Sequence, residues 1–216
     1  MILKRTIRVL FLAGGSISLL LLMMISSPNV QASDNAFGDG TFNSCTFSQC
    51  SITLTTSGTV NINITPGAST TCTVQSDAVG VLTDSSTGYN LTLNDSDTNN
   101  NIVGTTTATP IPAINALRTT SAALTANTWG YRIDDSGGAL GTTFGTGTTA
   151  QTNVAIGSLS INKFAKVPTS GSDQIATRSS AANPVVTTSV WYGICANLAV
   201  PADSYTDQVT YTALIN

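Results

Sequence analysis

Residues 89–94 read Tyr-Asn-Leu-Thr-Leu-Asn, and apolar and polar side chains alternate strictly through this stretch. Successive side chains of a β-strand point to opposite faces of its sheet, so the alternation is typical of a strand with one buried face. The stretch follows Ser-Ser-Thr-Gly at 85–88, residue types that favour a turn. The segment therefore predicts a half-buried strand that is entered from a turn.

The same period of two recurs on both sides of this stretch, and no segment after residue 32 shows sustained helical periodicity. Thr, which is frequent in these segments, suits strands because its branched Cβ fits the pleated surface. The pattern predicts strands within 52–55, 60–64, 79–81, 89–94, 129–133, 190–195 and 205–213. Seven or more short strands with Gly, Pro, Asn and Asp between them predict an all-β protein, a single antiparallel β-sandwich of immunoglobulin-like or jelly-roll type.

The segments between the predicted strands lack this alternation. Residues 136–147 are rich in Gly and Thr, residues 166–182 are polar, and both are predicted as long loops. The Pro- and Ala-rich residues 108–117 are predicted to cross an end of the sandwich. The predicted organisation is a signal peptide over 1–32, a lead or edge strand over 33–50 and the β-sandwich domain over 51–216.

The N-terminus has the order of a secretory signal peptide. Lys4, Arg5 and Arg8 precede an apolar run over 9–25, and Val-Gln-Ala ends at Ala32. A basic start, an apolar run and small residues before a cleavage site are typical of export, and we expect cleavage after Ala32. The alternative is an uncleaved membrane anchor, for which a 17-residue run is short. The predicted location is secreted, at the extracellular cell surface, with no membrane span after cleavage.

Composition argues against most catalytic chemistry. The chain contains no His and no Glu, its charged residues amount to 9%, and Thr occurs 36 times. Without His there is no Ser-His triad or imidazole base, and the common zinc hydrolase sites lack their ligands. After cleavage the chain would keep five basic and eleven acidic residues without a basic stripe, which disfavours nucleic acid as a partner. We therefore expect a protein that is not an enzyme.

Four cysteines follow the predicted leader, at Cys45, Cys50, Cys72 and Cys195. An even number in an exported chain predicts two disulfides, and three pairings are possible. We favour Cys45 with Cys50 and Cys72 with Cys195. The long bridge stabilises the fold by about 4–5 kcal/mol in the loop-entropy description. A zinc site is disfavoured because no C-x-x-C pair is present.

Four segments, 86–95, 127–134, 190–194 and 201–213, carry a resemblance in their order and spacing. Together they resemble a family of secreted, Thr-rich surface proteins predicted in small-genome, candidate-phylum bacteria. The resemblance spans about 52–213 and implies a secreted β-sandwich without implying an activity. The last segment is also weakly similar to spore-coat-U-like and fimbrial subunits and to WxL surface proteins, although the WxL signature is absent. The cysteine quartet is not part of this resemblance.

Asp95, Asp97 and Asn99 place side-chain oxygens at alternate positions, which is the reason to consider calcium. The EF-hand pattern fails, because Asn100 stands where Gly is needed and Thr106 where the bidentate Glu is needed. The alternative is a polar turn in which Asp and Asn bond the local backbone. We therefore expect no cofactor and no metal, and these three residues are only weak candidate ligands for calcium.

The remaining candidates for chemistry are weaker. Asp134 and Asp135 are adjacent, so in a strand they point to opposite faces and do not form an acid–base pair. Ser160 and Lys163 match S-x-x-K without the helix or the later K-T-G that this chemistry requires. Trp191 lies on the opposite strand face from Tyr192, so it is predicted to face solvent or a partner as a possible binding surface.

These observations favour a secreted cell-surface structural or adhesive subunit, as in an envelope, pilus or coat. Its partners would be copies of itself or other surface proteins, joined by strand addition at free sheet edges. The alternative is a soluble extracellular module that binds carbohydrate or a calcium-dependent ligand, for which Trp191 and the turn at 95–101 are the supporting features.

Overall fold

The computed structural model of this chain describes residues 41–42, 45–46, 50–134, 140 and 143–216. All of these belong to one compact unit, Asp39–Asn216. The predicted signal peptide and most of the predicted lead lie outside the described residues. The described part is nearly all β, and every pairing between its strands is antiparallel, as the alternation predicted.

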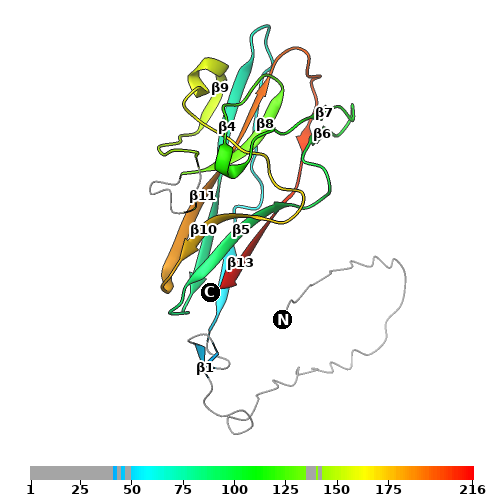
Figure 1. Cartoon of the computed structure of the whole chain (residues 1–216). Coiled ribbons are helices and arrows are strands. Elements are labelled where there is room, and N and C mark those ends of the chain that lie inside the picture. Colours follow the sequence, from blue (N-terminus) through cyan, green and yellow to red (C-terminus); the bar gives the residue numbers. More distant parts are fainter. Residues whose placement is uncertain (1–40, 43–44, 47–49, 135–139, 141–142) are drawn as a thin grey trace, which may run out of the picture. The chain divides into compact units, whose positions relative to one another are not determined.

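The largest sheet is built on two long paired strands, β4 (Thr71–Thr83) and β11 (Ala182–Ala196). Strand β8 (Thr128–Ile133) pairs with the other side of β11. Two strands share the other side of β4: β3 (Ile52–Thr55) pairs with its end and β9 (Gln151–Ala155) with its beginning. The result is a five-stranded sheet with β4 and β11 at its centre (Figure 1).

A second sheet has β5 (Tyr89–Asp95) at its centre, with β10 (Asp173–Arg178) and β13 (Val209–Ile215) as its edges. A small third sheet and a hairpin complete the strands. The third sheet has the order β12 (Tyr205–Thr206), β6 (Ile102–Gly104) and β7 (Pro110–Ile111). The hairpin pairs β1 (Thr41–Phe42) with β2 (Cys45–Thr46), and the two short 3-10 helices are η1 (Arg118–Thr120) and η2 (Ile156–Leu159).

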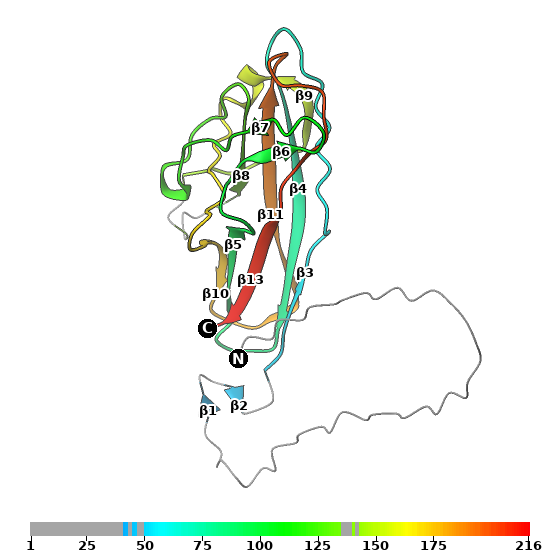
Figure 2. The ribbon, with the colours of Figure 1, turned by 90° about the vertical axis from the view of Figure 1, so that its right-hand side faces the viewer.

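The main core fills the space between the two larger sheets, where β5 and β13 pass over β4 and β11 (Figure 2). In β5 the residues Tyr89, Leu91 and Leu93 are buried and alternate with half-buried polar residues, as predicted. Their counterparts from the larger sheet include Val79 and Tyr192. The period of two therefore directs one face of each strand into a common core, which is the arrangement of a β-sandwich.

A second hydrophobic cluster covers the opposite face of the five-stranded sheet. It joins Cys72 and Cys195 to Leu124, Leu159 and Phe164, which come from segments without strand periodicity. Arg132 is 1% exposed on this face, where its guanidinium lies 5.9 Å from the Phe164 ring centroid and contacts Asp134 at 3.2 Å. Both faces of the large sheet are therefore covered in this region, whereas the alternation predicted one.

The predicted strand at 60–64 is wrong as a paired strand. Val60, Ile62 and Ile64 are half buried against the main core and alternate with exposed Asn, but the segment forms no β-ladder. Its carbonyls accept side-chain hydrogen bonds instead, for example Asn63 O from Thr73 Oγ1 at 2.9 Å. The alternation of apolar residues thus predicted correctly which side chains face inward. Hydrogen-bonded pairing also requires a neighbouring strand, which the local sequence pattern does not specify.

Three further boundaries differ from the prediction. Strand β4 already begins at Thr71, before the strand predicted at 79–81, and β10 lies inside the loop predicted over 166–182. The predicted strand at 205–213 is two strands, β12 and β13, which belong to different sheets. In the predicted loop 136–147, residues 136–139 and 141–142 lie outside the described part, and Phe144 is 1% exposed and packs edge-on against Tyr131.

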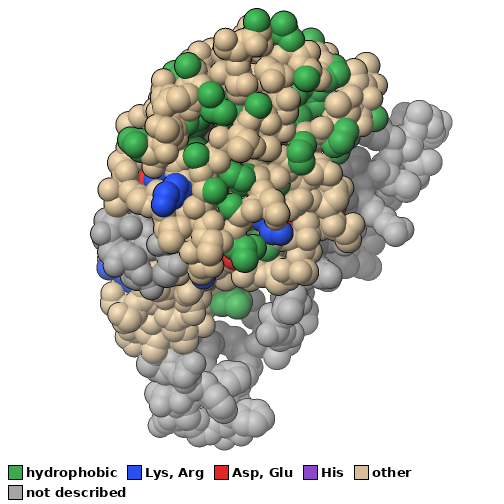
Figure 3. Space-filling view, turned by 45° about the horizontal axis from the view of Figure 1, so that its top comes forward, with side chains coloured by type: hydrophobic (Ala, Val, Ile, Leu, Met, Phe, Trp, Pro, Cys, Tyr) green, Lys and Arg blue, Asp and Glu red, His purple; other side chains and the backbone are tan. Residues whose placement is uncertain are grey.

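The surface carries few charged side chains. On the face that Figure 3 shows, uncharged polar side chains and backbone together cover most of the described surface, with scattered hydrophobic patches and only small separate patches of positive and negative charge. Within the described residues, no helix has the length and apolar character needed to cross a membrane.

Candidate functional site

Topology brings two distant connections together. The segment after β5 leads to β6, and the segment after β12 leads to β13. Because β6 pairs with β12 and β5 pairs with β13, both connections run between the same two sheets. A hydrogen bond from Ser96 N to Gln208 O, 2.9 Å long, joins them. Residues more than a hundred positions apart in the sequence therefore lie side by side.

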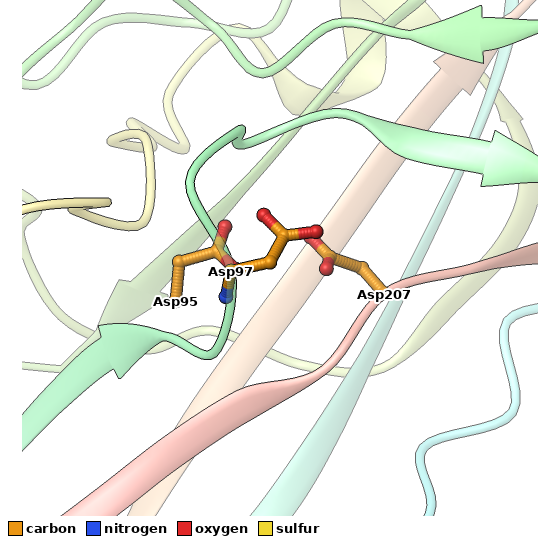
Figure 4. A group of neighbouring side chains, drawn as sticks. All are labelled: Asp95, Asp97 and Asp207. Carbon is orange, nitrogen blue, oxygen red and sulfur yellow. The ribbon is translucent and has the colours of Figure 1, made fainter.

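Three carboxylates meet at this junction, from Asp95, Asp97 and Asp207. One oxygen of each lies within 4.8 Å of the others. Figure 4 shows Asp95 and Asp97 on the β5–β6 connection, with Asp207 approaching them from the β12–β13 connection. Asp95 is 3% exposed and is the last residue of β5, whereas Asp97 is exposed. We call these three residues the carboxylate cluster.

The alternate Asp and Asn residues shape the loop through local hydrogen bonds. Asp95 Oδ1 accepts from Asp97 N at 3.1 Å, Asp97 Oδ1 from Asn99 N at 2.7 Å, and Asn99 Oδ1 from Asn101 N at 2.9 Å. These are successive Asx turns, the polar turn considered as the alternative in the sequence. Trp129 Nε1 also donates to Asn100 O at 2.9 Å, which holds the loop against the core.

Within the described residues, no basic side chain forms an ion pair with the cluster. The ion pairs there join Arg118 to Asp173 and Arg132 to Asp134. Burial, and then the charges of Asp95 and Asp97, raise the pKa of Asp207 to about 6. Burial likewise raises the pKa of Asp95, although hydrogen bonds from Asp97 N and Ser96 N act in the opposite direction.

The structure places the candidate calcium residues differently from the sequence pattern. Asp95 and Asp97 come together, but the Asn99 side chain is exposed and is occupied with the Asn101 amide. Asp207 takes the third position, and sequence reasoning missed it because a pattern within one loop cannot reveal a residue from another. In the sequence Asp207 lies inside the strand predicted over 205–213, and nothing there indicates that it would face Asp95 and Asp97.

A second carboxylate, four residues before Asp207, has different surroundings. Asp203 accepts hydrogen bonds from Thr106 N at 3.0 Å, Thr107 N at 2.6 Å and Ser204 N at 2.7 Å. These donors, led by Thr107, hold the pKa of Asp203 well below its usual range. A Cβ at Gly104 would lie 2.5 Å from Asp203 Oδ2, so the close approach requires glycine there. Asp203 therefore fixes the β6–β7 turn, and we call this set of hydrogen bonds the Asp203 clamp.

Trp191 does not present a free ring to solvent. It is half buried and packs against the second hydrophobic cluster, and its indole Nε1 is buried without a hydrogen-bond partner in the described part of the chain. The reason is the cover that residues such as Leu124 and Phe164 place over this face. Trp191 does lie opposite Tyr192, as predicted, and its role in binding stays a prediction.

The disulfide between Cys72 and Cys195 is confirmed, and it links directly opposed residues of β4 and β11 across a sequence separation of 123. Both cysteines are fully buried in the second hydrophobic cluster. The predicted partnership of Cys45 with Cys50 involves a side chain outside the described residues.

Strand β13 is fixed to the large sheet by a buried polar contact. The hydroxyls of Tyr192 and Tyr211 lie 2.6 Å apart, and burial raises the pKa of both phenols. Asp77, which is 4% exposed, lies near them and accepts from Ser57. These groups are enclosed in the core, so they stabilise the packing of the two sheets rather than form an accessible site.

Comparison with known proteins adds no relatives: no protein-family model, curated protein or solved structure matches the chain.

Proposed function

We propose that the protein is a secreted structural or adhesive subunit of a bacterial cell surface, without enzymatic activity, that joins copies of itself or other surface proteins by strand addition. The signal-peptide pattern, the charge-poor sequence and the resemblance to Thr-rich surface proteins support export to the surface. The Cys72–Cys195 bridge suits an oxidising compartment. The observation that carries the proposal is the edge strand β13.

Strand β13 pairs with β5 along one side, in an unbroken register from Val209 opposite Asp95 to Ile215 opposite Tyr89. In the described part of the chain, no strand pairs with its other side, and β3, which contacts it, pairs only with β4. An edge of this kind presents unpaired backbone groups to an incoming strand. Its outward side chains are Thr210, Thr212 and Leu214, the last 62% exposed.

The opposite edge of the same sheet has features that discourage strand addition. Strand β10 begins with Asp173, ends with Arg178 and has a register shift between Gln174 and Ala176. Charged residues and bulges are the usual protection of natural edges. Strand β13 reads Val-Thr-Tyr-Thr-Ala-Leu-Ile and has no charge, no proline and no register shift. Strand addition is therefore proposed at β13.

The alternative, a soluble carbohydrate-binding module, depends on an aromatic platform. Sugars stack on exposed aromatic faces, and Trp191, the residue proposed for this from the sequence, is half buried. The surface subunit is therefore the preferred function. A glycan array probed with and without calcium tests the alternative directly, and specific binding there would favour it.

The first experiment locates the native protein in cell fractions and measures its intact mass. The proposal expects mature protein beginning at Ser33, in the envelope and in high-mass assemblies. Mature monomer free in the medium would contradict a structural role. Full-length protein in the membrane fraction would contradict cleavage at Ala32 and indicate an anchored sandwich.

The second experiment tests the edge. Leu214→Lys places a charge on β13, and we expect it to abolish assembly while the monomer keeps its melting temperature. Ile161→Lys is the matched control, because Ile161 is 84% exposed in the turn after η2, a helix that packs beside β9 and β4. Size-exclusion chromatography with light scattering compares them. Equal assembly by both variants and wild type would show that β13 is not the contact.

A further inference from the structure

We propose that Asp95, Asp97 and Asp207 bind a calcium ion that joins the β5–β6 connection to the β12–β13 connection. Asp95 and Asp97 come from one connection and Asp207 from the other, and one oxygen of each lies within 4.8 Å of the others (Figure 4). Calcium–oxygen distances are about 2.3–2.6 Å, so two oxygens on one ion lie at most about 5 Å apart. The observed spacing fits a shared ion without rearrangement of the backbone.

One member of the carboxylate cluster has a buried oxygen without a hydrogen-bond partner among the described residues. Asp95 is 3% exposed, and its Oδ2 is inaccessible and has no hydrogen-bond partner among the described residues. A buried carboxylate oxygen without a donor or a counter-charge is strongly unfavourable. The other oxygen, Oδ1, already accepts the Asp97 amide, so the backbone turn does not need Oδ2. A cation beside Oδ2 supplies the missing interaction.

In the other two carboxylates, as in Asp95, Oδ1 accepts the hydrogen bond of the local turn. Asp97 Oδ1 accepts from Asn99 N, and Asp207 Oδ1 accepts from Gln208 N at 2.7 Å. Each turn thus uses one oxygen of its carboxylate and fixes the side chain in place. The second oxygen of each carboxylate is outside these turns, so an ion bound through it would leave the turn hydrogen bonds in place.

The donor set favours calcium over other divalent ions. All three ligands are carboxylates, which suit hard cations, whereas zinc sites in proteins use mainly His and Cys. Calcium takes six to eight oxygens in flexible geometry and completes its shell with amide oxygens and water. A surface hollow of about 360 Å³ adjoins Asp97 and Asp207, and Ser96, Asn101 and Gln208 also line it. This hollow gives room for such additional ligands.

The ion would act on the sandwich as a whole. Both connections run between the β10–β5–β13 sheet and the small β12–β6–β7 sheet. A calcium ion that holds them together therefore locks the small sheet to the edge of the sandwich beside β13. This role is independent of strand addition, so either proposal can fail without the other.

The test uses the mature chain with its disulfides intact, treated with EDTA and dialysed. Calcium chloride at about ten times the dissociation constant is expected to raise the melting temperature by roughly 3–6 °C. Terbium gives a direct signal, because Trp129 lies against the loop through its bond to Asn100 O and can sensitise bound terbium. Calcium should displace terbium with a dissociation constant of about 10⁻⁴–10⁻³ M, the range of extracellular modules.

Two variants locate the ion. Asp207→Asn and Asp97→Asn remove one ligand charge each without emptying a buried position, and both are expected to weaken calcium binding at least about tenfold. Asp84→Asn is the matched control, since Asp84 is an exposed carboxylate at the other end of β5, beyond the Ser85–Gly88 turn. Three results would overturn the proposal: no calcium-dependent shift in the wild type, equal binding by Asp207→Asn and Asp84→Asn, or an equal response to magnesium.

Discussion

Asp203 and Asp207 are four residues apart in one segment, and their carboxylates have opposite surroundings. Asp203 faces the backbone amides of Thr106, Thr107 and Ser204, which lower its pKa. Asp207 faces Asp95 and Asp97, and burial with their charges raises its pKa to about 6. Asp203 holds its segment against the β6–β7 turn, whereas Asp207 lies where the β12–β13 connection meets the end of β5.

The difference shows two ways in which a carboxylate can connect distant segments. Asp203 acts alone, because N–H groups already compensate its charge. Asp207 adds a third negative charge to a place where two exist, and like charges without a counter-ion oppose the contact. The first connection is complete within the protein, whereas the second is completed by the cation that we propose. The predictions below test this contrast.

The largest effect on the free energy of unfolding should come from a change that leaves both Asp203 and the carboxylate cluster intact. The double variant Cys72→Ala, Cys195→Ala removes a bridge on the sheet face turned away from the main core, and we expect a loss of about 2–5 kcal/mol in the free energy of unfolding. Urea unfolding measures it, and the response of the folded variant to calcium should be unchanged. A loss below about 1 kcal/mol would show that the bridge adds little to the ordered strands.

Disrupting the hydrogen bonds that Asp203 accepts should have the next largest effect on the free energy of unfolding. Gly104→Ala places a Cβ 2.5 Å from Asp203 Oδ2 and 2.7 Å from Thr107 Oγ1, so the clamp must open. We expect a cost of about 1–3 kcal/mol, with or without calcium. Gly157→Ala is the control, since a Cβ there meets nothing within 4 Å. Equal stability of the two variants would mean that the clamp yields easily.

The effect of Asp207→Asn on the free energy of unfolding should change sign when calcium is added. Without the ion it relieves repulsion from Asp95 and Asp97, and we expect a gain of a few tenths to about 1 kcal/mol, kept small because Asp207 is partly solvated. With saturating calcium the variant should be less stable than the wild type, because it lacks a ligand charge. Thermal unfolding in EDTA and in calcium measures both. If the variant changes stability in the same direction in EDTA and in calcium, Asp207 is not completed by a cation and does not differ from Asp203 in the way proposed.

The smallest effect is the pH dependence of the calcium-free protein. The pKa of Asp207 is raised from 3.8 to about 6, so the folded chain holds this proton more tightly than the unfolded chain. Its contribution is present in full below about pH 4 and is lost as the pH rises through about 6. Asp203 has a lowered pKa and the opposite sign, and its contribution is lost only as the pH falls below about 4.

Urea midpoints measured from pH 7 down to pH 4 in EDTA should therefore increase, and below pH 4 they should decrease. In Asp207→Asn the increase between pH 7 and pH 4 should be smaller. A midpoint that falls steadily from pH 7 would show that the carboxylate cluster does not take up protons on folding.

The sequence predicted the strands whose burial is decided by a single core. In β5, Tyr89, Leu91 and Leu93 face one core only, so their period of two appears directly in the sequence. In β11, Tyr192 faces the main core and Trp191 faces the second cluster, so the apolar pattern is nearly continuous and does not indicate which face is exposed. The cover over Trp191 comes from segments such as 159–164, whose burial has no strand period.

The candidate site was half predictable for a related reason. The alternation of Asp95, Asp97 and Asn99 specifies the Asx turns, which depend only on neighbours in the chain. The arrival of Asp207 depends on β13 pairing with β5 and β12 with β6, which is a property of the whole topology. Local pattern therefore identified the loop, and only the fold identified its third carboxylate.

The Cys72–Cys195 bond also determines how the molecule responds to pulling. A tension applied between residue 50 and residue 216 passes through the sulfur–sulfur bond, and the chain between the two cysteines carries none of it along its backbone. Only the segments before residue 72 and after residue 195 can be drawn out, and β13 lies in the second. A tethered subunit of this design would lengthen by a short, fixed amount and keep its central strands folded under load.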